Sequence, residues 1–541
     1  MSTLASRPPL RRIAAIAILA TCALLFSLPF ILCVIFNAGF LDLANEPLAY
    51  RFFYSERIFA GETVVVGVGY LISVLHHAVY GILHLFPAVA KGSLERRLDL
   101  FALTTNGILS ATLFVLFYLA ARSRQLRIGD LALLALVALV PIYGTRRLGF
   151  DYALMADYQF LNIVLCVAAL LLFQLYWRRE GKMSTRLEVV LLGAFVGMAA
   201  ANKITMLVVA GMVLVPAVAF AGVSRREFAL RTLLALTGLF GAFIAVHVIS
   251  YLGDLKMLAS AARIWWSFVS NPGGEPNFWE SIFGNLLLYD SYGDILLYGF
   301  FASILVFALV LKERSPGLDR VLMVVYCWLG ISACLFFVVK RPATPTLFES
   351  TIFIFTLSAA LLTVVLHLKA IRLLVAASCV FWAVYSFSTF EFVDNYKLVA
   401  GSQARAKLKW EVFEETRRLA AGRPIEVIFP DNSFHHEGVF ELLLKGASSV
   451  FPSWYITTGK TIIERYAPGM TFRYNYSVLT PNAPYGTNRV LVWFDRRDIP
   501  PLTSQYKELT NTVERTGVAR YQWLVLGKDG RQLTMNVAII P

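Results

Sequence analysis

Long runs of apolar residues, separated by short polar and basic segments, fill the chain up to about Phe387. The runs are about 17 to 25 residues long, the length that an α-helix needs to cross a bilayer. The pattern therefore predicts a polytopic α-helical membrane protein with about 11 transmembrane helices. The expected spans are Ile13–Phe36, Phe101–Ala121, Leu131–Tyr143, Phe160–Trp177, Val189–Ala201, Met206–Phe220, Thr232–Ser250, Ile295–Leu311, Val321–Val339, Thr351–His367 and Leu373–Phe387.

The stretch Val64–Val89 is also apolar enough to cross the membrane, but histidines and glycines interrupt it. Short cytoplasmic loops are enriched in Lys and Arg, and the basic loops of this chain fall in the cytoplasm only if Val64–Val89 stays outside. We therefore expect a cytoplasmic N-terminus, and one or two helices of Val64–Val89 in the outer interface, with their histidines and glycines facing polar surroundings. The basic residues behind this topology are Arg122, Arg124, Arg127, Arg178, Arg179, Lys182, Arg186, Arg225, Arg226, Arg231, Lys312, Arg314, Arg320, Lys369 and Arg372.

The pattern changes at about Val393, where the chain becomes polar and short strand-like runs replace the long apolar ones. One stretch, Ala406–Leu419, is helix-like. An Asp-Gly turn signal separates the last two strand-like runs and predicts a hairpin. We expect a transmembrane module over residues 1–392 and a small extracytoplasmic α/β domain over residues 393–541. The expected strands are Ile425–Phe429, Val490–Phe494, Tyr521–Leu526 and Leu533–Ile540.

Composition narrows the class of protein. The 541 residues are 58% hydrophobic and carry a formal net charge of +14. The Lys and Arg residues are spread between the apolar runs instead of gathering in one patch, which argues against a nucleic-acid partner. All 6 cysteines lie in apolar runs, so neither a disulfide scaffold nor a zinc pattern is expected. The first apolar run continues to Phe36 without a small-residue cleavage site, so we interpret it as a retained helix.

Acidic residues gather in the loop that follows the first predicted span. Carboxylates next to hydrocarbon are costly, and they persist mainly where they bind or react with a polar group. The loop Phe40–Glu62 holds four of them: Asp42, Glu46, Glu56 and Glu62.

Further charged residues are expected on the same side of the membrane. Asp151 and Asp157 follow the third span, and Lys203 lies between two apolar runs, where a cation needs an anion or a water-filled cavity. Lys340 and Arg341 close the ninth span. Cations of this kind suit a phosphate leaving group, while a carboxylate can take a proton from an attacking hydroxyl. The alternative for Lys203 is a local ion pair or a snorkelling side chain.

The order of these elements resembles the GT-C superfamily of polyprenyl-phosphate-sugar-dependent glycosyltransferases, which includes the lipid A aminoarabinose transferases and the protein O-mannosyltransferases. In those families the loop after the first helix carries an acidic pair followed by a Tyr, and then a Gly-acid step. Glu46, Tyr50 and Gly61-Glu62 have a matching spacing here. Pro47 replaces the second acid of the pair, so Glu46 and Asp42 both remain candidates for the catalytic position.

The resemblance covers about Arg11 to Lys203 in detail. It continues through a short helix that contains His76 and His77, and Asp157 resembles the second acidic residue of the family, with Asp151 as its competitor. Gly193, Gly197 and Lys203 resemble the segment that follows in the family. Lys340 and Arg341 lie near the place where the family often has a cation for the donor phosphate.

The resemblance implies an inverting glycosyltransferase of the bacterial inner membrane, with the C-terminal domain in the periplasm. A polyprenyl-phosphate-linked sugar donor would enter between the helices, with its phosphate at Lys203 and at Lys340 or Arg341. A hydroxyl of a lipid, glycan or protein acceptor would lose its proton to Glu46 or Asp42. Tyr50, His76, His77, Asp151 and Asp157 are the further candidates for substrate binding. Metal dependence varies in the superfamily, so a divalent Mg²⁺ or Mn²⁺ ion at Asp157 stays an option.

Two other functions fit parts of the pattern. A secondary transporter would also place charges inside a helical bundle, but it would show broken helices in two halves and would not need a C-terminal domain of about 150 residues. A lipid-linked glycan ligase or polymerase would rely on Arg and His in a large outer loop. The loop Gly253–Asp294 has Lys256 and Arg263 but no His.

Overall fold

A computed structural model describes the following residues of the chain: 8–43, 46–61, 69–145, 147–154, 157–179, 184–218, 224–269, 318–340, 344–423, 425–428, 472–474, 488–496, 520–526 and 532–541. Most of them are helical. Six of the described helical segments are long and apolar enough to cross a membrane, so the protein has the architecture of a helical membrane protein. These segments are Ala15–Ile35, Leu94–Arg122, Tyr158–Trp177, Arg225–Ser250, Phe348–Val365 and Lys369–Thr389.

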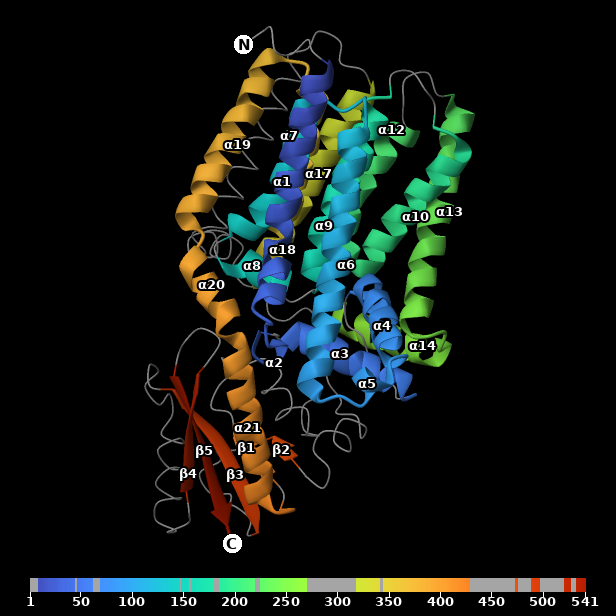
Figure 1. Cartoon of the computed structure of the whole chain (residues 1–541). Coiled ribbons are helices and arrows are strands. Elements are labelled where there is room, and N and C mark those ends of the chain that lie inside the picture. Colours follow the sequence, from blue (N-terminus) through green and yellow to red (C-terminus); the bar gives the residue numbers. More distant parts are fainter. Residues whose placement is uncertain are drawn as a thin grey trace. The chain divides into compact units, whose positions relative to one another are not determined.

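The described elements follow one another along the chain as labelled in Figure 1. The helices are α1 (Pro8–Ile35), α2 (Phe40–Leu43), α3 (Glu46–Phe59), α4 (Tyr70–His84), α5 (Pro87–Ala90), α6 (Leu94–Arg122), α7 (Ile128–Tyr143), α8 (Arg147–Leu154), α9 (Tyr158–Trp177), α10 (Arg186–Asn202), η2 (Ile204–Met206), α11 (Leu207–Ala210), η3 (Gly211–Leu214), α12 (Val215–Val218), α13 (Arg225–Ser250), α14 (Leu255–Val269), α17 (Leu318–Lys340), α18 (Thr344–Val365), α19 (Lys369–Thr389), α20 (Phe392–Ala400) and α21 (Ser402–Ala420). The strands are β1 (Ile425–Ile428), β2 (Phe472–Tyr474), β3 (Arg489–Arg496), β4 (Arg520–Leu526) and β5 (Gln532–Ile540).

Helices occupy the positions of the predicted spans wherever the chain is described. The predicted span Ile295–Leu311 lies outside the described residues. Some of the other segments form shorter apolar helices, such as Ile128–Tyr143 and Ile204–Val218, and their crossing of the membrane stays a prediction. The stretch Val64–Val89 contains α4 and the short helix α5, which agrees with the prediction of one or two helices there.

The chain divides into two compact units, which we describe separately. The helical unit comprises Met1–Phe30, Val68–Val74 and Asn106–Phe392. The mixed unit comprises Ile31–Gly67, Leu75–Thr105 and Val393–Pro541. The predicted division of the chain into residues 1–392 and 393–541 stays a prediction.

In the helical unit, α18 lies at the centre and packs against α7, α9 and α17. Every residue of its apolar segment Phe348–Val365 is buried. Two hydroxyl groups of this segment are satisfied inside the helix, since Thr356 and Thr363 donate to the carbonyl oxygens four residues earlier. A polar but internally hydrogen-bonded helix can therefore lie inside an apolar bundle without unpaired donors at these two positions.

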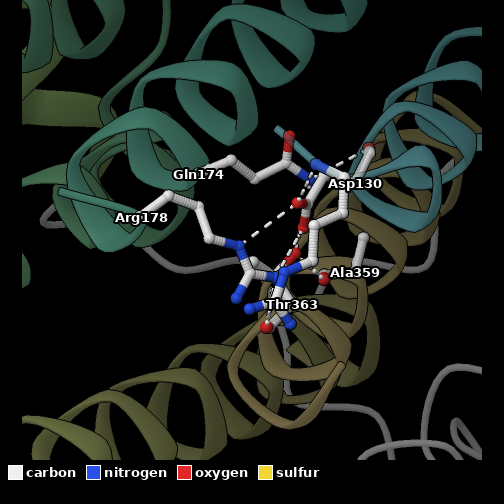
Figure 2. A network of polar contacts seen from close by, with 6 residues as sticks. Asp130, Gln174, Arg178, Ala359 and Thr363 are labelled. Carbon is white, nitrogen blue, oxygen red and sulfur yellow. Dashed lines mark hydrogen bonds and ion pairs between the residues drawn. The ribbon is translucent and has the colours of Figure 1, made fainter. Parts of the chain in front are cut away.

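A buried polar network fixes α7, α9 and α18 to one another (Figure 2). Arg178, just after α9, donates from Nη2 to Asp130 Oδ1 at 2.8 Å and from Nε to Oδ2 at 3.2 Å. The same guanidinium donates to the carbonyl oxygen of Thr363 in α18 at 3.2 Å. Gln174 donates to the carbonyl oxygen of Asp130 and to the Thr363 hydroxyl. Arg178 thus connects three helices. In the sequence it was used only as one of the basic residues that predict the membrane topology.

In the mixed unit, the strands form a mixed sheet in the order β2-β1-β3-β5-β4. β1 runs parallel to β2 and β3, and β5 runs antiparallel to β3 and β4. The predicted hairpin and the predicted helix are confirmed as β4–β5 and α21, and α21 packs against both of these strands. β2 was not predicted, because a strand of 3 residues leaves almost no alternation to detect.

Candidate functional site

The predicted site residues fall in both units. Lys203, Asp151, Asp157 and the end of α17 at Lys340 belong to the helical unit, whereas Asp42, Glu46, Tyr50, His76 and His77 belong to the mixed unit. Arg341 lies outside the described residues, and so do the side chains of Glu46, Tyr50 and Lys340. The backbone places Glu46 at the first position of α3.

Lys203 lies at a break in a helical segment. α10 ends at Asn202, Lys203 has extended backbone angles of φ −156° and ψ 133°, and the 3-10 turn η2 begins at Ile204. The chain then continues as short alternating pieces of α-helix and 3-10 helix up to Val218. Such breaks at membrane depth occur where the freed backbone groups meet protein partners or a polar cavity. The break therefore gives Lys203 an unusual position between two apolar helical pieces.

The ammonium group of Lys203 is paired with a buried acid. Its Nζ donates to Glu349 Oε2, and the hydroxyl of Thr205 donates to the other carboxylate oxygen of Glu349. The ring centroid of Tyr158 is 5.4 Å from Nζ, within the range of a cation–π contact. Lys203 is 18% exposed and Glu349 only 4%. The lysine is thus the accessible partner of this pair, and the glutamate lies behind it.

Asn202, the residue before Lys203, ties the break to two other segments. Its side-chain amide donates to the carbonyl oxygen of Tyr158 at 3.2 Å and to Asn162 Oδ1 at 2.8 Å. Its side-chain oxygen accepts from the backbone N–H of Ile72 at 3.2 Å, and its backbone oxygen accepts from Gly69 at 2.8 Å. The start of α9 and the start of α4 are therefore both attached to the residue that precedes Lys203.

Three further acidic residues lie near Tyr152 in α8. Burial raises the pKa of the Tyr152 phenol well above its ordinary value, and nearby groups add to the rise: Tyr158, Asp157, Asp151 and Glu349. Asp157 is buried at the N-terminus of α9, where its Oδ1 accepts from the N–H of Tyr158 at 2.6 Å. The fold thus places Asp151, Asp157 and Glu349 around Tyr152, and Glu349 also pairs with Lys203.

The residues around Asp157 show whether a divalent metal ion could be coordinated there. Among the described residues, no group of three or more His, Cys, Asp or Glu side chains is arranged to hold a metal ion. One oxygen of Asp157 is already used as a helix cap. A divalent ion needs several oxygen ligands, so the described residues do not fit a metal site, and we derive no step through a metal.

In the mixed unit, Asp42 is buried and paired twice. Its Oδ1 accepts from Lys409 Nζ at 2.7 Å and its Oδ2 accepts from Arg405 Nε at 2.9 Å. Both cations belong to α21, more than 360 positions later in the chain. Both oxygens of the Asp42 carboxylate are therefore engaged in ion pairs.

The two predicted histidines are buried in the same unit, one beside an aromatic ring and the other beside a hydroxyl group. His76 is fully buried and its ring lies 5.1 Å from that of Phe101 in α6. His77 shares a hydrogen bond of 2.9 Å between its Nδ1 and the Ser55 hydroxyl of α3. Because α4 packs its histidine face onto α3 and α6, these side chains are interior groups of the unit.

Next to them lies a cluster that the sequence did not reveal. Arg97 of α6 forms a buried ion pair with Glu56 of α3 and donates to the Tyr80 hydroxyl at 3.1 Å and to His84 Nε2 at 3.3 Å. The Tyr80 hydroxyl in turn donates to Glu56 at 3.3 Å. This cluster holds the C-terminal half of α3. The sequence analysis singled out Glu56 as one of the acids of the predicted loop Phe40–Glu62. Its partner Arg97 lies 41 residues further along the chain, so no local sequence pattern predicts the pair.

No family model matches the sequence, and neither a curated protein nor a solved structure is significantly similar to the chain. The helical unit offers a partly exposed cation in a break between apolar helices, backed by buried carboxylates. A cation in such a place can bind an anionic group that is attached to a lipid.

Proposed function

We propose that the protein is a membrane glycosyltransferase of the GT-C type, which transfers a sugar from a polyprenyl-phosphate donor to an acceptor hydroxyl. In this proposal the chain has eleven spans in the inner membrane, a cytoplasmic N-terminus and a periplasmic C-terminal α/β domain. The proposal combines the sequence resemblance over Arg11–Lys203 with the helical membrane architecture. The acceptor is a lipid, a glycan or a protein.

The observation that carries the proposal is the setting of Lys203. Its ammonium lies at a break between apolar helical pieces, is partly exposed, is paired with the buried Glu349 and contacts the ring of Tyr158. A donor whose lipid tail lies among the helices would bring its phosphate to this depth. The positive charge would stabilise the negative charge that develops on the leaving phosphate oxygen. Lys340 and Arg341 are proposed as further phosphate ligands.

The proposed reaction is a single displacement. The acceptor oxygen attacks the anomeric carbon, the bond from this carbon to the phosphate oxygen breaks, and polyprenyl phosphate leaves. The acceptor proton passes to the carboxylate of Glu46 as the general base, and the configuration inverts. We assign the base to Glu46 because both oxygens of the buried Asp42 are already paired with cations. The Asp42 side chain is also fully buried, whereas an acceptor hydroxyl needs an accessible carboxylate.

The test begins with mass spectrometry of envelope glycolipids and glycans from a deletion strain and its complemented parent. We expect one sugar modification to disappear in the deletion strain, to return with the wild-type gene, and to stay absent with Glu46→Gln. The exposed Glu411→Gln on α21 is the matched control and should restore the modification. An unchanged glycan and glycolipid profile in the deletion strain would contradict the proposal.

One observation favours a second candidate, a secondary transporter. The alternating short helical pieces from Ile204 to Val218 resemble the discontinuous helices that line substrate sites in transporters. Proteoliposomes that receive a labelled sugar in the outside medium distinguish the two functions. Gradient-driven uptake without any sugar transfer to lipid or acceptor would replace the enzyme proposal by this one.

A further inference from the structure

A buried ion-pair latch joins α2, in the loop after the first helix, to α21, near the C-terminal sheet. It consists of Asp42, Lys409 and Arg405, with the distances of 2.7 and 2.9 Å given above. Asp42 is fully buried and the Lys409 side chain is 1% exposed. Breaking one partner of such a buried pair leaves an uncompensated charge in the interior.

Backbone contacts surround the latch and depend on close approach. A Cβ atom on Gly39 would lie 2.7 Å from the Cβ of Ala406 in α21, so only glycine fits there. The N–H of Gly39 donates to the Ser402 hydroxyl at 3.1 Å, and this hydroxyl donates to the carbonyl oxygen of Val399 at 2.7 Å. On the other side, the N–H of Phe40 donates to Asp99 Oδ1 at 2.7 Å. α2 is therefore fixed to α21 and α6.

The latch lies immediately before the helix that carries the proposed base. α2 ends at Leu43 and α3 begins at Glu46, so Asp42 precedes Glu46 by little more than one helical turn of sequence. The far half of α3 is held by the pair of Glu56 with Arg97. The structure therefore fixes α2, just before α3 in the chain, to α21, and fixes the far half of α3 to α6.

We propose that Asp42 is a positioning residue, through which Lys409 and Arg405 of α21 set the place of Glu46. The C-terminal segment is then part of the catalytic arrangement, because it holds the loop that carries the base. This inference rests on the proposed function, since it assigns the base to Glu46. The competing assignment makes Asp42 itself the base.

The test uses the full-length protein in nanodiscs, with Asp42→Asn, Lys409→Met and the double variant. Lys407→Met is the matched control, because Lys407 lies two residues away on α21 in an exposed pair with Glu411 at 3.9 Å. Hydrogen exchange of residues 46–59 is measured by mass spectrometry without substrate. We expect roughly tenfold faster exchange in both single variants, the same increase in the double variant, and no change in the control.

Transfer activity gives the second readout, with the sugar donor identified by the deletion strain. Asp42→Asn and Lys409→Met are expected to lower kcat by about 10- to 100-fold, with the donor KM within about twofold and the pH dependence of kcat unchanged in shape. Lys409→Arg keeps the charge and should recover most of the activity. Glu46→Gln should have no transfer activity.

Three results would contradict the positioning role of Asp42, the role of α21 or the proposed function. If Asp42→Asn removes all transfer while exchange in residues 46–59 stays at the wild-type rate, Asp42 is the base and the latch is wrong. If Lys409→Met changes neither exchange nor kcat, α21 does not position the loop. If the wild-type protein transfers no sugar but exchange responds as expected, the latch stands and the proposed function fails.

Discussion

Gly197 of α10 lies against the backbone of Leu239 in α13, and a Cβ atom on Gly197 would be only 2.1 Å from the carbonyl oxygen of Leu239. The same relationship recurs one turn earlier between Gly193 and Ala235, and in reverse between Gly238 and Val190. Small residues of this kind let helix backbones approach closely in a membrane, where packing replaces the hydrophobic effect between helices.

Gly197→Ala is therefore expected to destabilise the helical unit by about 1–3 kcal/mol, because one backbone must move to accept the methyl group. Thermal unfolding in detergent, followed by size-exclusion chromatography, measures the change. Gly241→Ala in α13 is the matched control, since nothing lies within 4 Å of its Cβ position. Equal melting temperatures for the two variants would show that the α10–α13 contact is looser than described.

Removing Arg178 should be among the most destabilising single changes outside the proposed site. Arg178→Met leaves the fully buried Asp130 without its cationic partner, which costs about 3–5 kcal/mol. The adjacent Arg179→Met breaks a half-exposed pair with Glu188 and should cost less than about 1 kcal/mol. The two variants are compared by their folded yield and their melting temperature after detergent extraction. Similar losses from both variants would contradict a special role of the network in Figure 2.

Lys203→Ala is expected to weaken the binding of undecaprenyl phosphate by roughly 10- to 100-fold, because a charge-assisted contact with the phosphate is lost. Native mass spectrometry of the protein in nanodiscs measures this binding directly. The exposed Lys256→Ala should change it by less than about twofold. In transfer assays the donor KM should rise more than the acceptor KM, and an equal rise in both would make Lys203 a structural residue.

Glu349→Gln should act in the opposite direction from Lys203→Ala. The carboxylate of Glu349 shares the Lys203 ammonium, so its removal leaves more of the positive charge for a phosphate. We expect the affinity for undecaprenyl phosphate to rise by about 3- to 10-fold in the same assay. Weaker binding in a well-folded Glu349→Gln protein would mean that Glu349 holds Lys203 in its working position.

Glu46→Gln should abolish transfer while leaving folding and donor binding nearly unchanged, because only the proton acceptor is lost. Single-turnover transfer, hydrogen exchange and phosphate binding are measured on the same preparation. Full activity of the Glu46→Gln variant would mean that Asp42 is the general base. Full activity in the Glu46 and Asp42 variants alike removes this loop from the mechanism.

The local signals in the sequence predicted the long apolar helices and most strands, because apolar runs and alternation are properties of consecutive residues. They missed polar helices such as α3, which lies in the stretch predicted as the loop Phe40–Glu62. They also predict Lys203, Asp151 and Asp157 on one side of the membrane, and this topology stays a prediction. The sequence could not predict the ion-pair partners of Lys203 and Asp42. Glu349 lies 146 residues from Lys203, and Lys409 lies 367 residues from Asp42. No periodicity links positions so far apart, and the chemistry of Asp42 depends on that distant partner.

Asn202 gives the break at Lys203 a mechanical meaning. Its amide and backbone connect the first residue of α9, the start of α4 and the end of α10, so three pieces of chain meet at one residue. The backbone that carries Lys203 is thereby attached to the segment Gly69–Ile72. Any rearrangement at Lys203 has to keep or break these hydrogen bonds of Asn202.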